Sequence, residues 1–582
     1  MKDMKYILKE FHKKEWLLTA CSIGFILIQV WMDLNLPAYM SRITLLSETR
    51  GTAMQDILKT GGEMLLFALG SLCASCMTAV CISALSADIG GNLRKGVFHQ
   101  VMQFSMAETD RFSPASLITR STNDITQVQT MIVMGLQVIV KAPVTAIGAI
   151  GKMSDTVWQW TAVTVIGTVL IIGSVTICAM IILPHQKKVQ KRTDDITRIA
   201  DESLSGMEVI HAYNAENTAE EKFSDVNADL TKNNLSAIRT MAFLSPDVQL
   251  ILNGMTLAIY WIGAVLISQT GTMQQAGLFA GMLAFAQYAV QIVNAFVSLT
   301  MVFTMIPKAM VSLNRISEVL KTSPSVKDSG NVKATESDGT LSFDHVDFCY
   351  PGEEKPTIRD ISFQAEPGET LAIIGSTGSG KSTVVNLIPR FYDPTHGEIR
   401  IDGVNIRDYS LKDLREKIGY CSQQAVLLSG TVQSNISCGS SVNEESMEKA
   451  LKTSQSESFV EKMDGKENAR IMQEGSNLSG GQKQRLSIAR ALAKSPEILI
   501  LDDSTSALDY ETERNLRRDL SENYSNTTKI IITQRIGNAK DADEILVMDQ
   551  GKIVGKGKHE DLMKNCQVYR QIAQTQSEEA AL

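Results

Sequence analysis

A glycine-rich loop followed by Lys and Ser marks the place where this sequence could bind phosphate. Residues 375–382 read G-S-T-G-S-G-K-S, after the apolar run 371–374 and before a helical pattern. Such a loop lets backbone N–H groups close around phosphate oxygens, and the N-terminus of the next helix adds positive potential. We therefore predict ATP binding through the following residues: Gly375, Ser376, Thr377, Gly378, Ser379, Gly380, Lys381, Ser382 and Thr383.

A second motif supplies carboxylates. Residues 498–503 read I-L-I-L-D-D, which predicts a buried strand that ends in Asp502 and Asp503. In a P-loop site Lys381 would reach the β- and γ-phosphates, while the Ser382 hydroxyl and Asp502 would hold Mg²⁺. The two motifs together predict ATP and Mg²⁺ as cofactors.

A third motif, L-S-G-G-Q at residues 478–482, opens a predicted helix. With it the chain resembles the ATP-binding cassette (ABC) transporters, in their exporter branch with fused membrane and nucleotide domains. In that family each ATP lies between one chain's phosphate loop and the other chain's signature. The resemblance implies an adenine-stacking aromatic, a Q-loop glutamine that also approaches the Mg²⁺, a D-loop and a signature that acts in trans. These are, in order, Tyr350, Gln423, residues 506–509 with Asp509, and Ser479, Gly480, Gly481 and Gln482.

Two positions depart from the family pattern. The family has a catalytic Glu after the Mg²⁺-binding Asp, and this chain has Asp503; the family has a switch His, and this chain has Gln534. Asp is one methylene shorter than Glu, and a misplacement of about 1 Å can cost on the order of 100-fold in rate. Gln carries neither a proton nor a charge at neutral pH. We predict intact nucleotide binding and a weakened catalytic site.

A weak site beside an intact signature fits one half of an asymmetric heterodimer. We expect an unlike half-transporter as partner, with this chain's signature completing the partner's active site. The expected substrates are hydrophobic or amphipathic compounds, either drug-like molecules or lipids, moved out of the cytoplasm or the inner leaflet. Two alternatives stay open: a homodimeric exporter or lipid flippase with full activity, and an ATP-gated channel or sensor subunit.

The elements that must carry these motifs fall into a membrane half and a polar half. Residues 248–307 contain no Asp, Glu, Lys or Arg over 60 positions, which is incompatible with a wholly soluble protein. The net charge of −8 argues against nucleic-acid binding. We predict a six-helix all-α transmembrane domain at 1–320, a linker at 321–340, and an α/β P-loop ATP-binding cassette domain at 341–575. The predicted spans are 16–45, 60–85, 130–152, 156–183, 248–268 and 275–306.

Lys and Arg near the span ends predict the orientation. The loop 86–129 has four basic residues and the loop 185–245 has eight, more than the loops on the other side. Both termini and both long loops are therefore expected in the cytoplasm of a multi-pass cell-membrane protein. Within the first loop, residues 112–124 are the predicted docking surface for the cytoplasmic domain.

Two charged residues fall inside predicted spans, Asp33 in the first and Lys141 in the third. An unpaired charge at this depth is costly, so each needs a partner or a polar cavity. The sequence leaves structural pairing and substrate contact both open.

Overall fold

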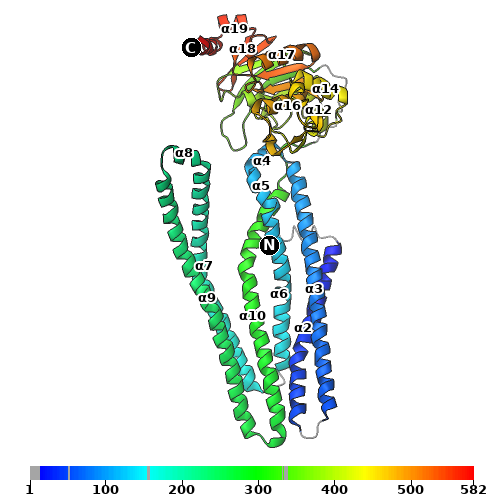
Figure 1. Ribbon diagram of the computed structural model, residues 1–582, viewed down its shortest axis with the longest axis vertical. Helices are drawn as coiled ribbons and strands as arrows, with labels where there is room; N and C mark the ends of the chain where they lie inside the picture. The colour runs from blue at the N-terminus through cyan, green and yellow to red at the C-terminus, as the bar shows by residue number, and fades with distance from the viewer. Residues whose placement is uncertain are drawn as a thin grey trace. The chain divides into compact units, whose positions relative to one another are not determined.

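The computed structural model describes residues 13–49, 53–153, 157–328, 330, 332 and 339–581, which form two compact units (Figure 1). One unit contains residues up to Gln100 together with Ala115–Thr322, and the other contains Val101–Pro114 and the chain from Ser323 onward. Of the predicted linker, residues 329, 331 and 333–338 lie outside the described part, as does residue 156 at the start of the fourth predicted span.

The secondary-structure elements described in the first unit are all helices, and six of its helical segments are long and apolar enough to cross a bilayer. This confirms the predicted six-helix membrane domain. The helices are α2 (Lys13–Glu48), α3 (Met54–Met102), α5 (Pro114–Ser121), α6 (Asn123–Met153), α7 (Trp158–Ser205), α8 (Met207–Ala212), α9 (Glu216–Gln269) and α10 (Thr272–Lys321).

Several of these helices run well beyond the apolar runs that predict the spans. The helices α7 and α9 pack along each other and are joined by the short α8 (Figure 1). In the polar part of this pair, Arg192 on α7 lies 2.8 Å from Asp229 on α9 and 3.2 Å from Asp195 on its own helix. Ion pairs between charged side chains therefore hold α7 and α9 together beyond the end of their apolar sequence.

Asp33 and Lys141 form an ion pair between α2 and α6, with 3.7 Å between the carboxylate oxygen and the ammonium nitrogen. The Ser71 hydroxyl on α3 donates to the other Asp33 oxygen at 2.5 Å. From α10, Gln291 donates to the Asp33 carbonyl at 3.4 Å. The structure thus shows structural pairing for the two charges that the sequence placed in predicted spans.

The second unit contains the polar half of the chain. Its strands are β1 (Leu341–Phe348), β2 (Ile358–Ala365), β3 (Thr370–Gly375), β4 (His396–Ile401), β5 (Val404–Asn405), β6 (Ile418–Cys421), β7 (Gly430–Thr431), β8 (Arg470–Ile471), β9 (Ile498–Asp502), β10 (Thr528–Ile532), β11 (Glu544–Asp549) and β12 (Lys552–Gly557). Its helices are α4 (Met106–Phe112), α11 (Lys381–Leu387), α12 (Leu411–Glu416), α13 (Val432–Ser437), α14 (Glu444–Thr453), α15 (Glu457–Val460), α16 (Gly480–Leu492), α17 (Tyr510–Asn523), α18 (Ile536–Ala539), α19 (His559–Asn565) and α20 (Gln567–Ala581), with 3-10 turns at Lys466–Asn468 and Gln473–Gly475.

A six-stranded sheet in the order β12-β11-β3-β10-β9-β6 forms the centre of this unit. All neighbouring pairs are parallel except β11 with β12. The strands read as continuous apolar runs because helices cover both faces of such a sheet. A separate antiparallel sheet, β2-β1-β4-β5, packs its apolar side chains into the same core. The predicted α/β cassette domain is therefore confirmed.

The sheet register brings the predicted motifs together. Ile373 on β3 pairs with Ile532 on β10, and Ile532 pairs with Asp502 on β9. The carboxyl ends of these three strands lie at one edge of the sheet, where ligands of open α/β sheets bind. The phosphate loop follows β3, Asp503 follows β9, and Gln534 comes shortly after β10.

Candidate nucleotide site

The glycine-rich loop is shaped by backbone conformations that only glycine adopts easily. Gly378 has φ 80° and Gly380 has φ 98°, both in the left-handed region. At Gly375 a Cβ atom would lie 2.2 Å from the Met548 carbonyl oxygen, so a side chain does not fit there. The Lys381 ammonium group donates to the carbonyls of Gly375 at 2.9 Å and Ser376 at 2.7 Å. The loop therefore folds around the lysine that the sequence predicts as phosphate ligand.

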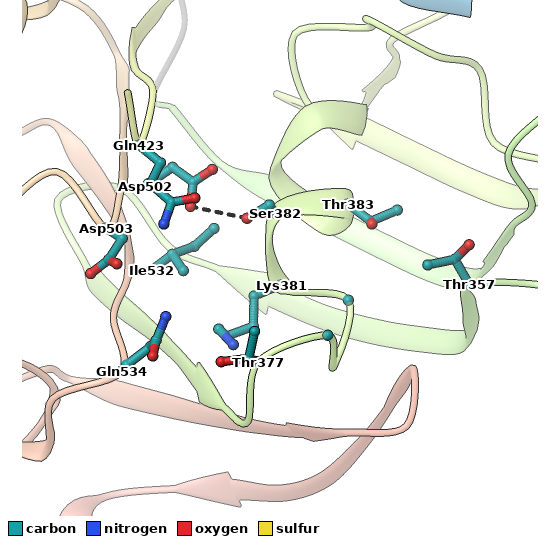
Figure 2. Close-up of a pocket in the computed structure, with 12 residues that line it drawn as sticks. Thr357, Thr377, Lys381, Ser382, Thr383, Gln423, Asp502, Asp503, Ile532 and Gln534 are labelled. Atoms are coloured by element: carbon teal, nitrogen blue, oxygen red, sulfur yellow. Dashed lines mark hydrogen bonds between the residues drawn. The ribbon is translucent and has the colours of Figure 1, made fainter. Parts of the chain in front are cut away.

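The carboxylates and the loop border one pocket of about 250 Å³ (Figure 2). In this view Gln423, Asp502, Asp503 and Gln534 lie on one side, opposite the loop and the start of α11. The Ser382 hydroxyl donates to Asp502 at 3.2 Å, so two of the three predicted Mg²⁺ ligands are adjacent. Their oxygens are of the kind that Mg²⁺ prefers.

Burial changes the acid–base properties of the charged groups here. It raises the pKa of Asp502, an effect that the hydrogen bond from Ser382 partly offsets. Burial likewise raises the pKa of Asp503, although the charges of Arg535 and Lys381 lower it in part. Burial lowers the pKa of Lys381. A raised pKa makes Asp503 a better proton acceptor than a solvated Asp, so its short reach is what would limit it as a base.

The two departures from the family pattern occupy the pocket itself. Asp503 is half-buried with φ 45°, and its backbone N–H donates to the Ile532 carbonyl at 3.0 Å. Gln534 is exposed at the pocket mouth. Among the described residues that line this pocket there is no Glu and no His. Within this described lining, therefore, no Glu or His takes the place of either group.

The signature and the D-loop begin helices away from this chain's own pocket. Ser479 caps α16: its hydroxyl oxygen accepts from the Gln482 N–H at 3.3 Å, and its N–H donates to the Gln482 side chain at 2.9 Å. The hydroxyl oxygen acts as acceptor, which leaves its proton for another group. Asp509 caps α17 by accepting from the Thr512 N–H, a bond that lowers the Asp509 pKa. Ser479 and Asp509 are both exposed.

Tyr350 lies beside the pocket and is not among its lining residues. Its ring packs edge-on against Phe348 and Tyr392, and its hydroxyl lies 3.1 Å from the Thr383 hydroxyl. Thr383 does line the pocket, so the tyrosine is one contact away from the nucleotide position.

Replacing Tyr350 with Ala should weaken ATP binding at this site by about tenfold at most. The reason is that offset stacking contributes about 0.5–1.5 kcal/mol beyond area burial. Tyr350→Phe keeps the ring and loses only the contact with Thr383, so its affinity should stay close to that of the unmodified chain. Titration with a fluorescent ATP analogue measures both variants. An Ala variant with unchanged affinity would remove Tyr350 from the adenine site.

A short helix from the membrane half belongs to the second unit, together with residues 112–114 of the predicted docking surface. The predicted segment was 112–124, whereas α4 (Met106–Phe112) is the helix grouped with the cassette. Tyr392 donates to Asp110 at 2.8 Å, and the Ser325 N–H donates to Glu108 at 3.1 Å. Burial alone would raise the pKa of Glu108, but hydrogen bonds from Ser105 and Ser325 outweigh it and lower that pKa.

Most of the predicted segment has a different structural role. Arg120 donates to the Arg315 carbonyl and to Glu318, each at 2.8 Å, and Asp124 accepts from Ser312 at 2.6 Å. These bonds fasten α5 and the start of α6 to α10 within the first unit. The polar pattern of this segment reflects helix-to-helix bonds, which a single sequence does not distinguish from a docking surface.

A P-loop pocket in one unit and six long apolar helices in the other define a membrane-embedded nucleotide-binding protein. Residues 358–506 match the ABC transporter family and residues 19–306 match the ABC transporter transmembrane region. An uncharacterized ABC transporter ATP-binding protein of Mycobacterium tuberculosis is 37% identical over 90% of this chain and 89% of its own length. The ATP-dependent lipid A-core flippase of Vibrio vulnificus is 30% identical over 91% of each chain.

A solved structure has the same fold. The ATP-bound structure of a bacterial Atm1-family ABC exporter aligns with a TM-score of 0.79, at 22% identity, over 96% of this chain and 98% of that chain. The chain therefore belongs to the ABC transporter family. It carries the transmembrane region and the ABC transporter cassette domain in one chain, with an exporter-type fold, and cassette domains of this family couple ATP hydrolysis to transport.

Proposed function

We propose that this chain is the weakly hydrolysing half of a heterodimeric ABC exporter that moves hydrophobic or amphipathic compounds out of the cytoplasm or the inner leaflet. One observation carries the proposal: Asp503 and Gln534 stand in the pocket that holds Lys381, with no Glu or His among its described lining residues. Both termini and the two long loops would lie in the cytoplasm of a cell-membrane protein.

The residues of this chain would bind ATP well. Backbone N–H groups of the loop and the N-terminus of α11 would receive the phosphates, and Lys381 would neutralise their charge. Ser382, Asp502 and Gln423 would hold Mg²⁺, which supplies charge neutralisation between the β- and γ-phosphates. Thr377 and Thr383 add hydroxyls to the same pocket. Binding therefore depends on residues that this chain retains.

Hydrolysis depends on residues that this chain lacks. Asp503 has a pKa raised by burial, yet its carboxylate stops one methylene short of a Glu. A proton acceptor must come within hydrogen-bond reach of the attacking water, and about 1 Å of misplacement costs on the order of 100-fold. The Gln534 amide can donate a hydrogen bond to a phosphate oxygen, but it cannot carry a proton or a charge. ATP bound at this site would accordingly be hydrolysed slowly.

The exposed signature supports an unlike partner. Ser479 and the N-terminus of α16 offer donors to a γ-phosphate bound by another chain. The partner would carry a Glu and a His at the two positions where this chain has Asp503 and Gln534. Because the partner's own signature faces the weak site, that motif is free to differ from L-S-G-G-Q.

The relative in Vibrio vulnificus is named for the movement of a lipid, and this favours an amphipathic substrate. It also keeps a second candidate in place, a homodimeric lipid flippase with two working sites. A channel or sensor subunit that binds ATP without pumping is the third. Transport against a gradient that requires hydrolysis separates the exporter from the channel.

The full chain purified alone should bind Mg-ATP but hydrolyse it weakly. The physical reason is the retained phosphate loop beside the two altered catalytic positions. Nucleotide affinity and steady-state ATPase, measured on the same preparation with Lys381→Ala as the background control, give the answer. Robust hydrolysis that Lys381→Ala abolishes would support the homodimeric flippase and end the heterodimer proposal.

A further inference from the structure

The C-terminal helix α20 reaches back to the switch segment through one side chain. The Gln576 amide nitrogen donates to the Gln534 carbonyl. The Gln576 amide oxygen accepts from the Ile536 N–H at 2.8 Å. One glutamine thus binds the backbone on both sides of Arg535, directly next to the side chain that enters the nucleotide pocket.

The helix that carries Gln576 is firmly anchored. Tyr569, near the start of α20, is fully buried against Ala372 and Ile374 of β3 and Ile545 of β11. Its hydroxyl also lies 2.7 Å from the His559 ring. The position of Gln576 is therefore set by the same central strand, β3, that leads into the phosphate loop.

The switch segment has other supports as well, among them a bond from the Arg535 N–H to the Thr533 hydroxyl at 3.0 Å and one from Arg517 to the Gly537 carbonyl at 2.9 Å. β10 ends at Ile532, and after it the Thr533 N–H donates to the Ile373 carbonyl at 3.2 Å. Further along, the Asn538 side chain donates to the Thr505 hydroxyl, ahead of the D-loop, at 3.2 Å. Between these two points the Gln534 side chain is exposed. An exposed side chain on a short loop needs its backbone held if it is to keep a fixed direction toward the pocket.

We propose that Gln576 is a positioning residue, which holds the switch segment so that Gln534 points at the γ-phosphate. The proposal rests on the proposed function in one respect, that ATP occupies the pocket. Gln534 and Lys381 line this pocket together, so a ligand phosphate that Lys381 binds lies within the space that Gln534 faces. ATP and ADP differ by the γ-phosphate alone, so a loosened switch segment lowers the affinity for ATP and leaves that for ADP unchanged.

The test compares the affinities of Mg-ADP and of the β,γ-imido analogue of ATP, which is not hydrolysed, for the full chain. In Gln576→Ala both bonds to the segment are lost. We expect the analogue to bind about two- to twelvefold more weakly, which corresponds to the 0.5–1.5 kcal/mol of one hydrogen bond from Gln534 to the γ-phosphate, with ADP affinity unchanged. Gln576→Glu keeps an acceptor for the Ile536 N–H but loses the donor to the Gln534 carbonyl. Its affinity for the analogue should therefore lie between those of the unmodified chain and Gln576→Ala.

Gln571→Ala on the exposed face of α20 is the matched control and should behave like the unmodified chain. An unchanged ratio of the two affinities in Gln576→Ala would overturn the proposal. Equal weakening of both nucleotides would overturn it as well, because it would show a merely structural role for α20. Failure of the unmodified chain to bind either nucleotide would instead refute the proposed function, so the two failures are distinguishable.

Discussion

Replacing Asp503 with Glu and Gln534 with His together should raise the ATPase rate of the full chain purified alone by about 100-fold. The longer carboxylate recovers the reach that the Asp lacks, and a shift of about 1 Å corresponds to roughly this factor. The burial that raises the pKa of Asp503 should act on a Glu at the same position and favour proton acceptance. The intact signature of a second copy would complete each site.

Each single replacement should recover only part of the rate, because the base and the switch act on the same water and phosphate. Adding Lys381→Ala to the double variant should abolish the gain, since the phosphates then lose their cation. Cross-linking of the purified chain shows whether wild type and variant dimerise to the same extent. Equal dimerisation with no gain in rate would show that these two residues do not limit hydrolysis.

In the proposed heterodimer, damage to this chain's signature should reduce hydrolysis far more than damage to its phosphate loop. Ser479→Ala with Gly480→Asp should reduce steady-state hydrolysis by at least about 100-fold. The Ser479 hydroxyl and the N-terminus of α16 are preorganised donors, and losing one such donor costs on the order of 3 kcal/mol. Lys381→Ala removes ATP from the weak site and should leave appreciable ATPase activity. The activity should fall only in part, because without that ATP the two subunits associate less tightly.

A control must show that the signature change leaves α16 folded, because Ser479 also caps that helix. Ser479→Thr retains both the hydroxyl and the cap and should keep most of the activity. If Lys381→Ala were the more damaging change, this chain's own site would be the one that hydrolyses ATP, and the asymmetric scheme would fail.

The sequence predicted the fold correctly because it contains two strong signals, long charge-free runs and short continuous apolar runs. Charge-free runs longer than a bilayer span give membrane helices, and the apolar runs before Gly375 and at 498–501 give parallel strands. The order of the motifs along the chain was enough to predict that Lys381, Asp502 and Gln534 lie in one nucleotide site. Its physical basis, the pairing of β3 and β9 with β10, became visible only in the sheet.

Other features depend on side-chain contacts between distant segments, which one sequence does not encode in any local pattern. Residues 112–124 suggested a docking surface, whereas Asp110 and Glu108 make the bonds within the cassette unit. The pairing of Asp33 with Lys141 joins two helices far apart in the chain. Gln576 lies in a polar C-terminal stretch and carries no motif, and only its two bonds to the switch segment indicate a role.

ATP at this chain's phosphate loop should be hydrolysed slowly. A heterodimer whose partner has lost its P-loop lysine retains only this site for ATP. Single-turnover conversion of radiolabelled ATP to ADP in that complex measures its rate directly. We predict conversion on the order of 100-fold slower than in the converse complex, in which Lys381→Ala leaves only the partner's site. Equal rates in the two complexes would contradict the account.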